Sequence, residues 1–193
     1  MNTNRQWVLA KRPSGLVTQD NFTYTETPIP EPGDGEVLVR NLYLSFDPTQ
    51  RGWMEDRPSY LPPVAIGEPM RAGSVGQVVE SRHADFATGD LVQTTGGWQD
   101  FVVVAPGQGP MGLSKVPEGV SAQMMLSVLG ITGLTAYFGL LDLGNPQTGE
   151  TVLVSGAAGA TGSVAGQIAR IKGCNVVGIA GGPEKCAWLK DEA

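Results

Sequence analysis

Eight residues at 155–162, Ser-Gly-Ala-Ala-Gly-Ala-Thr-Gly, constrain the fold of this chain more than any other segment. They follow an apolar run at 151–154 and precede a stretch at 161–172 whose apolar residues recur at helical spacing. We expect strands at 151–155 and 175–180 and a helix at 161–172 between them. Strand, glycine-rich turn, helix and strand in this order are typical of a parallel βαβ unit, in which the turn brings free backbone N–H groups to a helix start.

The glycine pattern matches the dinucleotide-binding fingerprint G-x-G-x-x-G at two of its three glycines. Over 157–162 the chain reads Ala-Ala-Gly-Ala-Thr-Gly, so Ala157 stands where the first glycine is expected. The flanking strand, helix and second strand favour a nucleotide-binding turn over the alternative, a turn with a purely structural role.

The end of the second strand indicates which nucleotide binds. NAD sites place an acidic residue there, which hydrogen-bonds the ribose 2′-hydroxyl. Here Gly181-Gly182 follows the strand without an acid, which permits the 2′-phosphate of NADP. Lys185 is placed to meet that phosphate as a point charge. The alternative is a solvated helix lysine, and Glu184 beside it argues mildly against the phosphate contact.

Short segments rich in β-branched and aromatic residues, separated by glycine and proline clusters, fill the first 120 residues. We expect strands at 6–11, 22–27, 36–45, 73–80, 90–94 and 98–104. The proline-rich segment 57–63 is expected to be a surface loop. After residue 120 the pattern changes to two helices, at 121–129 and 133–141, followed by the βαβ unit. We therefore place a domain boundary near residue 120.

Composition excludes several classes of partner. The net charge is −6 and the sequence pI is near 4.7, so no basic field attracts nucleic acid or anionic lipid. The N-terminus lacks the apolar core of a signal peptide, and no apolar run reaches the roughly 18 residues of a membrane span. We expect a cytoplasmic protein with neither nucleic-acid nor membrane partners.

Metal dependence is not expected. Cys174, Cys186 and His83 are the only cysteines and the only histidine, and their spacing does not suit a zinc site. Cys174 is expected to be a small buried residue and Cys186 to lie on a helix. His83, in a polar stretch, is expected to be exposed.

Several motifs together closely resemble the zinc-independent medium-chain reductases. The resemblance is to the branch of leukotriene B4 dehydrogenase/prostaglandin reductase and the related bacterial and plant NADPH-dependent double-bond reductases, and it covers nearly the whole chain. The residues that carry it are Ser45-Phe46-Asp47-Pro48, Arg51-Gly52, Gly133 to Leu141, the glycine turn, Gly166-Gln167-Ile168-Ala169 and Gly181 to Lys185.

The resemblance implies a fold class, a GroES-like β barrel followed by a truncated α/β Rossmann-like domain. Residues 1–120 would form the GroES-like domain on the substrate side. Residues 121–193 would supply linking helices and the first βαβ unit of the NADP-binding domain. By position, Gly159, Ala160, Thr161 and Gly162 would bind the pyrophosphate of NADP(H), and Lys185 the 2′-phosphate.

The same resemblance implies hydride transfer from NADPH to the β-carbon of an α,β-unsaturated ketone or aldehyde, followed by protonation of the enolate. Two alternatives stay open, a quinone reductase of the same superfamily and a non-catalytic binding module. No catalytic residue is assigned. Residues 149–193 suffice for two strands and one complete helix, whereas a Rossmann domain has about six strands. We therefore expect a truncated, inactive chain, and a homodimer only at full length.

Departures from the family pattern bear on the site. Gly67-Glu68-Pro69 stands where zinc-dependent relatives carry Gly-His-Glu, and Thr49 stands where many double-bond reductases have tyrosine. Tyr60 is either a packed loop residue or a substrate contact. Asp47 and Arg51 are expected to form a structural ion pair. Another group is expected mainly to pack, with contact to the nicotinamide as the alternative: Met124, Met125, Thr135 and Tyr137.

Overall fold

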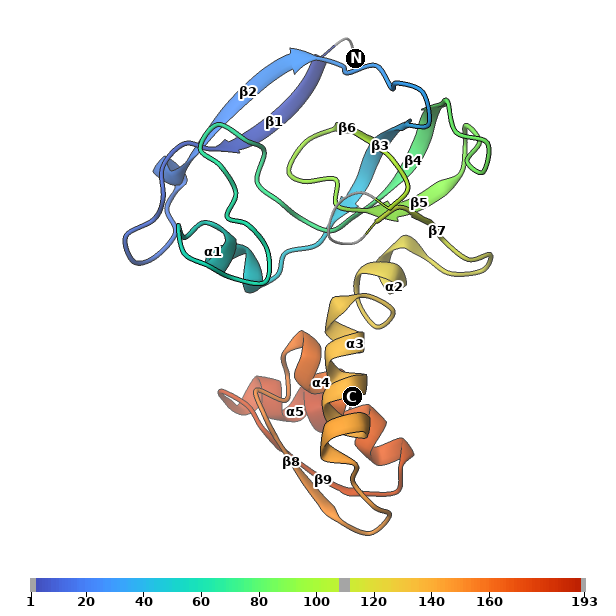
Figure 1. The fold of residues 1–193 in the computed structure, drawn as a ribbon. Coiled ribbons are helices and arrows are strands. Elements are labelled where there is room, and N and C mark those ends of the chain that lie inside the picture. Colours follow the sequence, from blue (N-terminus) through green and yellow to red (C-terminus); the bar gives the residue numbers. More distant parts are fainter. Residues whose placement is uncertain (1–2, 108–111, 192–193) are drawn as a thin grey trace. The chain divides into compact units, whose positions relative to one another are not determined.

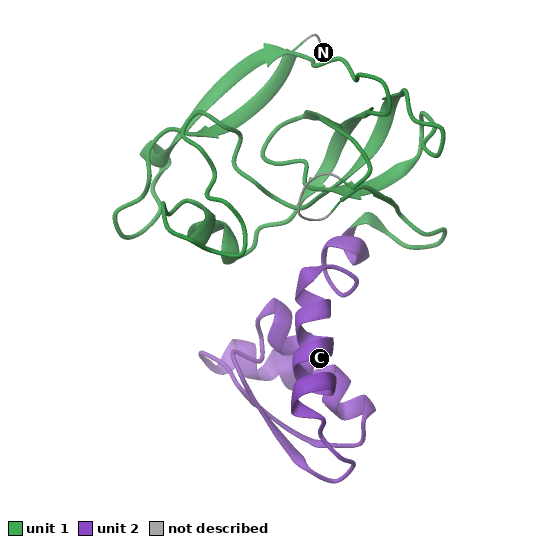
Figure 2. Cartoon of the chain, viewed as in Figure 1, with its two compact units in different colours: residues 1–122 green, residues 123–193 purple. Residues whose placement is uncertain are grey.

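The computed structural model describes residues 3–107 and 112–191, which divide into two compact units (Figures 1 and 2). Unit 1 spans Met1–Ala122 and unit 2 spans Gln123–Ala193.

Unit 1 is built from antiparallel strands, and among its described residues they form two sheets. In the smaller sheet β1 (Thr3–Leu9) pairs with β2 (Phe22–Pro28). The larger sheet has the order β6-β3-β4-β5-β7. Its strands are β3 (Val37–Leu44), β4 (Ser74–Ser81), β5 (Leu91–Thr94), β6 (Phe101–Val104) and β7 (Ser114–Lys115).

Two apolar clusters form the core of unit 1. Alternate residues of β3 point to the same face, so Val37 and Val39 pack with Val78 and Val92 of the neighbouring strands, and all four are fully buried. The second cluster joins β1 to a short helix and the loops around it, and contains Leu9, Trp53, Met54, Val64 and Met70.

That short helix, α1 (Thr49–Trp53), was not expected from the sequence, and neither was β7. The expected ion pair between Asp47 and Arg51 is wrong. The Arg51 guanidinium instead lies 2.9 Å from Glu55 Oε1 and also donates to the carbonyl oxygen of Gly15 at 3.0 Å. Asp47 and Glu55 both lie four residues from Arg51, so spacing alone does not choose between them; the guanidinium takes Glu55 together with the carbonyl oxygens of Pro13 and Gly15.

The proline-rich segment 57–63 is a loop, as expected, and two side chains hold it. Arg71 donates to the carbonyl oxygen of Pro62 at 2.9 Å, and Trp53 Nε1 donates to the Tyr60 hydroxyl at 3.1 Å. Tyr60 is nevertheless 70% exposed, so it is not the packed loop tyrosine of the first interpretation. His83 is half-buried rather than exposed, because its ring packs edge-on against Phe86.

Unit 2 begins within α2 (Ala122–Leu126) and continues through α3 (Ile131–Tyr137). Its βαβ unit matches the expected order: β8 (Thr151–Ser155), α4 (Ala160–Ile171), β9 (Asn175–Ile179) and then α5 (Pro183–Asp191). The two strands pair in parallel, with Thr151 opposite Asn175 and Ser155 opposite Ile179. The crossover through α4 therefore brings the carboxyl ends of both strands to one edge.

Helix η2 (Phe138–Gly144) differs from the α-helix expected at 133–141, because the chain leaves α3 and continues as a π-helix. Asn145 ends it in the left-handed conformation, with φ of 42°. Apolar spacing predicts the helix, but it does not distinguish the hydrogen-bond pattern within it. None of the described helices is long and apolar enough to span a bilayer.

Asn4 joins the first strand of unit 1 to a strand almost a hundred residues away. It is 1% exposed, its Nδ2 donates to the carbonyl oxygen of Phe101 at 2.9 Å, and its Oδ1 accepts from the Phe101 N–H at 2.9 Å. On the solvent side of the same junction, Arg5 hydrogen-bonds Asp100 at 2.6 Å and lowers the pKa of that carboxyl. Together these contacts fix β1 beside β6.

We expect Asn4→Ala to lower the free energy of unfolding by about 1 to 3 kcal/mol, because it leaves the buried N–H and C=O of Phe101 without partners. Urea unfolding followed by tryptophan fluorescence measures this change. Thr3→Ala is the control, since it removes an exposed hydrogen bond to Glu26, and it should change stability by less than about 0.5 kcal/mol. Equal effects of the two substitutions would contradict the assigned role of Asn4.

Candidate nucleotide-binding site

The glycine turn connects β8 to α4 and is fastened to β9. Gly156 adopts a φ of 64°, which a residue without a Cβ reaches at no steric cost. The N–H of Ala157 donates to the carbonyl oxygen of Ile179 at 3.0 Å, and the N–H of Gly159 donates to that of Gly156 at 2.8 Å. The turn is thus held both to itself and to the neighbouring strand.

Gly162 allows the first turn of α4 to lie directly against the glycine turn. A Cβ at this position would collide with the carbonyl oxygen of Gly156 and lie 2.9 Å from Cα of Ala157. Close helix packing of this kind is the role of the third glycine in a dinucleotide-binding fingerprint.

The start of α4 presents donors that the chain itself does not use. Within the described residues, the backbone N–H groups of Ala160, Thr161 and Gly162 make no hydrogen bond, and the first helical bond runs from the Ser163 N–H to the Gly159 carbonyl oxygen at 2.9 Å. The positive end of the helix dipole lies at the same place. This arrangement suits an anionic group such as a pyrophosphate.

The predicted pyrophosphate residues lie together at this helix start, but they do not contribute equally. Gly159 is the N-cap of α4, and its N–H is already engaged with Gly156. The free donors therefore come from Ala160, Thr161 and Gly162. Gly159 contributes no free donor, but it has no side chain that would keep a ligand from the helix start.

Lys185 lies in the first turn of α5, and its side chain is exposed. Because β8 and β9 are parallel, α5 begins at the same sheet edge as the glycine turn. The connection after β9 is Ala180-Gly181-Gly182, which carries no acid, and a Cβ on Gly181 would meet no atom within 4 Å. The structure therefore leaves room beside this connection and places no carboxylate within it.

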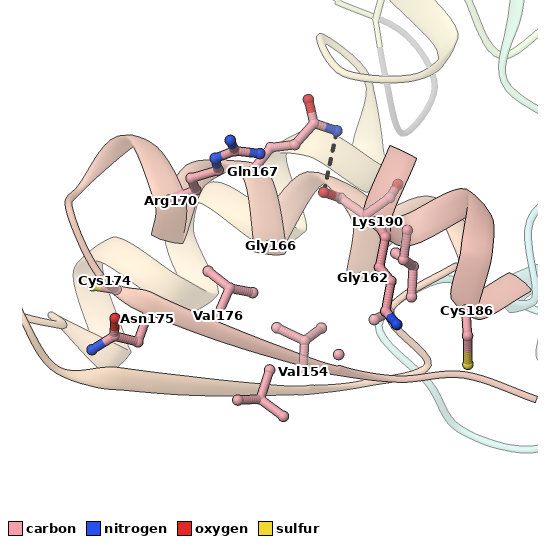
Figure 3. A pocket seen from close by; sticks show the side chains of 15 residues that line it. Val154, Gly162, Gly166, Gln167, Arg170, Cys174, Asn175, Val176, Cys186 and Lys190 are labelled. Atoms are coloured by element: carbon pink, nitrogen blue, oxygen red, sulfur yellow. Dashed lines mark hydrogen bonds between the residues drawn. The ribbon is translucent and has the colours of Figure 1, made fainter. Parts of the chain in front are cut away.

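A cavity of about 710 Å³ lies alongside the turn, between α4, α5 and the two strands (Figure 3). Of the predicted site residues only Gly162 lines it. Two cations, Arg170 and Lys190, contribute to its walls, and the rest of its lining is mainly small and apolar. The cavity begins at the glycine turn, where Ala157 and Gly162 line it, and extends along β9 from Gly178 to Asn175, away from the free N–H groups and Lys185. Sequence reasoning missed it because it depends on how α5 packs.

The cysteines lie where the sequence predicts. Cys174 is buried, with its sulfur 3.4 Å from the carbonyl oxygen of Gln147, and Cys186 lies on α5. Within the described part of the chain, no three His, Cys, Asp or Glu side chains gather as a metal site.

Comparison with known proteins adds independent evidence. Residues 5–113 match a family described as the N-terminal domain of oxidoreductase. The NADPH-dependent curcumin reductase of Escherichia coli is 50% identical over 183 residues, which are 95% of this chain and 52% of that protein. Prostaglandin reductase 1 of Bos taurus is 41% identical over 186 residues, 96% of this chain and 54% of that protein.

A solved structure agrees with these matches. The CurA protein of Vibrio vulnificus, in complex with NADPH, is 47% identical with a TM-score of 0.89, over 97% of this chain and 55% of that one. The chain spans about half the length of the curated relatives it matches. These matches show that the chain belongs to the medium-chain dehydrogenase/reductase family, in the branch of the NADPH-dependent double-bond reductases, and that it corresponds to their N-terminal part.

Proposed function

We propose that this chain forms part of an NADPH-dependent reductase of the C=C bond in α,β-unsaturated ketones or aldehydes. The observation that carries the proposal is the helix start with three free N–H groups, held against a glycine turn. The names of two relatives support it, a curcumin reductase and a prostaglandin reductase. We also propose that unit 2 is the first βαβ unit of a Rossmann-type NADP-binding domain.

The residues present fit the cofactor in charge and in hydrogen-bond donors. The N–H groups of Ala160, Thr161 and Gly162 would donate to pyrophosphate oxygens, and the helix dipole would stabilise their negative charge. Lys185 would attract the 2′-phosphate, where an acidic residue would repel it. NADPH itself supplies the hydride, so the tasks of these residues are to bind the cofactor and to fix its position.

The substrate proposal is a small enone or enal. In such a reduction the hydride goes to the β-carbon, and a proton completes the product at the α-carbon. We assign neither the proton donor nor the groups that stabilise the enolate oxygen. Tyr60 stays a candidate substrate contact, since its ring is exposed and its hydroxyl accepts a hydrogen bond from Trp53.

A chimera tests the activity. In the chimera, this chain takes the place of the aligned N-terminal part of the E. coli curcumin reductase. The two sequences are 50% identical over the aligned residues. We expect NADPH oxidation with simple enones or enals, followed by loss of absorbance at 340 nm, and a saturated ketone or aldehyde as product. Turnover with quinones alone would favour the quinone reductase alternative. A folded chimera that oxidises no NADPH with any acceptor would refute the proposal.

Lys185→Ala tests cofactor choice. We expect it to weaken binding of NADPH by about 1 to 3 kcal/mol and to leave binding of NADH nearly unchanged, because only NADPH carries the 2′-phosphate. Titration of the 193-residue chain, monitored by nucleotide fluorescence, measures both affinities. Lys172→Ala, at the opposite end of α4, is the matched control and should change neither affinity. Equal losses for both nucleotides would show that Lys185 does not select the phosphate.

Gly162→Ala tests the helix start. We expect weaker NADPH binding, by about tenfold or more, and a loss of stability of about 1 to 3 kcal/mol, because the new methyl group collides with the Gly156 carbonyl oxygen. Gly166→Ala is the control in the same helix. Its Cβ would lie 3.7 Å from Val176 Cγ1, an ordinary contact, so stability should rise by up to about 1 kcal/mol. If Gly162→Ala binds NADPH as tightly as the parent, the pyrophosphate does not lie at this helix start.

A further inference from the structure

We propose that Gly178 of β9 positions the pyrophosphate-binding turn by making room for the methyl group of Ala157. The inference rests on the proposed function and assigns a role to a residue outside the fingerprint. It also explains how the turn accommodates alanine at the position of the first glycine.

Ala157 lies where the turn is closest to β9. It is only 3% exposed, and its N–H donates to the carbonyl oxygen of Ile179, the residue after Gly178. Its Cβ is bonded directly to the backbone and has no rotamer by which to move aside. The methyl group must therefore fit between the turn and the strand.

Gly178 provides that space. A Cβ built on Gly178 would lie 2.9 Å from the Cβ of Ala157, closer than two carbon atoms approach, and 3.4 Å from Leu189 Cδ1 of α5. Its φ is not positive, so the strand conformation itself does not call for glycine. Glycine inside a strand lowers stability, and its presence here is explained by the close approach of the turn.

Movement of Ala157 is transmitted to the helix start. A Cβ on Gly162 would lie 2.9 Å from Cα of Ala157, so the first turn of α4 packs directly on this residue. Gly178, Ala157 and Gly162 thus form one continuous contact from β9 to the free N–H groups. A methyl group added at Gly178 displaces Ala157, and with it the donors that face the pyrophosphate.

A double-mutant cycle tests this contact in the full 193-residue chain. Gly178→Ala is expected to raise the Kd for NADPH by about tenfold and to lower the Tm by roughly 5 °C, as overpacking does. In the double variant Ala157→Gly, Gly178→Ala, the methyl group moves from one side of the contact to the other. Its Kd and Tm are expected to return close to those of Ala157→Gly alone. Gly166→Ala, whose added methyl group has room, should leave Kd unchanged.

The amide chemical shifts of Ala160, Thr161 and Gly162 provide a readout that does not depend on NADPH. Gly178→Ala should move all three signals, and the double variant should return them. Additive effects on Tm would refute the contact. If the effects of the two substitutions on Tm are non-additive but the three amide signals do not move in Gly178→Ala, the positioning role is refuted. If the parent chain binds no NADPH, the nucleotide site assigned to it under the proposed function is contradicted, while the Tm and shift cycles still decide the present proposal.

Discussion

The contact between the glycine turn and the backbone around it is the constraint on which the rest of unit 2 depends. Gly162 lies against the carbonyl oxygen of Gly156, and the Ala157 N–H fastens the same turn to Ile179 of β9. Because the turn is held against α4 on one side and against β9 on the other, the positions of β8, α4 and β9 relative to one another are fixed. The free N–H groups at the start of α4 are therefore fixed before any ligand arrives, which reduces the ordering cost of binding an anion.

Unit 1 depends on a different kind of link, between parts of the chain that are distant in sequence. Asn4 and Arg5 of β1 bind Phe101 and Asp100, at or beside the start of β6. Buried side-chain bonds to backbone groups specify the register because every alternative leaves polar groups unpaired. The two apolar clusters supply the rest of the core of unit 1, one around Leu9 of β1 and one on β3, β4 and β5.

The success of sequence reasoning varied with the range of the interaction concerned. The strand at 151–155 and the helix and strand that follow it were predicted closely, because periodicity and glycine positions are local signals. The five-residue helix α1 was missed, since it is too short to show a period, and its Arg51 pairs with Glu55 rather than with Asp47. The π-helical end of α3 was missed because its hydrogen-bond pattern leaves no mark on apolar spacing.

The sequence by itself determined the order of the elements, the place of the glycine turn and the family, because each depends on residue type at short spacing. Only the tertiary structure decided which donors at the turn are free, namely those of Ala160, Thr161 and Gly162, since the N–H of Gly159 is engaged within the turn. It alone also brought Ala157, at the first fingerprint position, against Gly178. Gly178 lies about twenty residues further along the chain, and only the parallel pairing of β8 with β9 brings the two into contact.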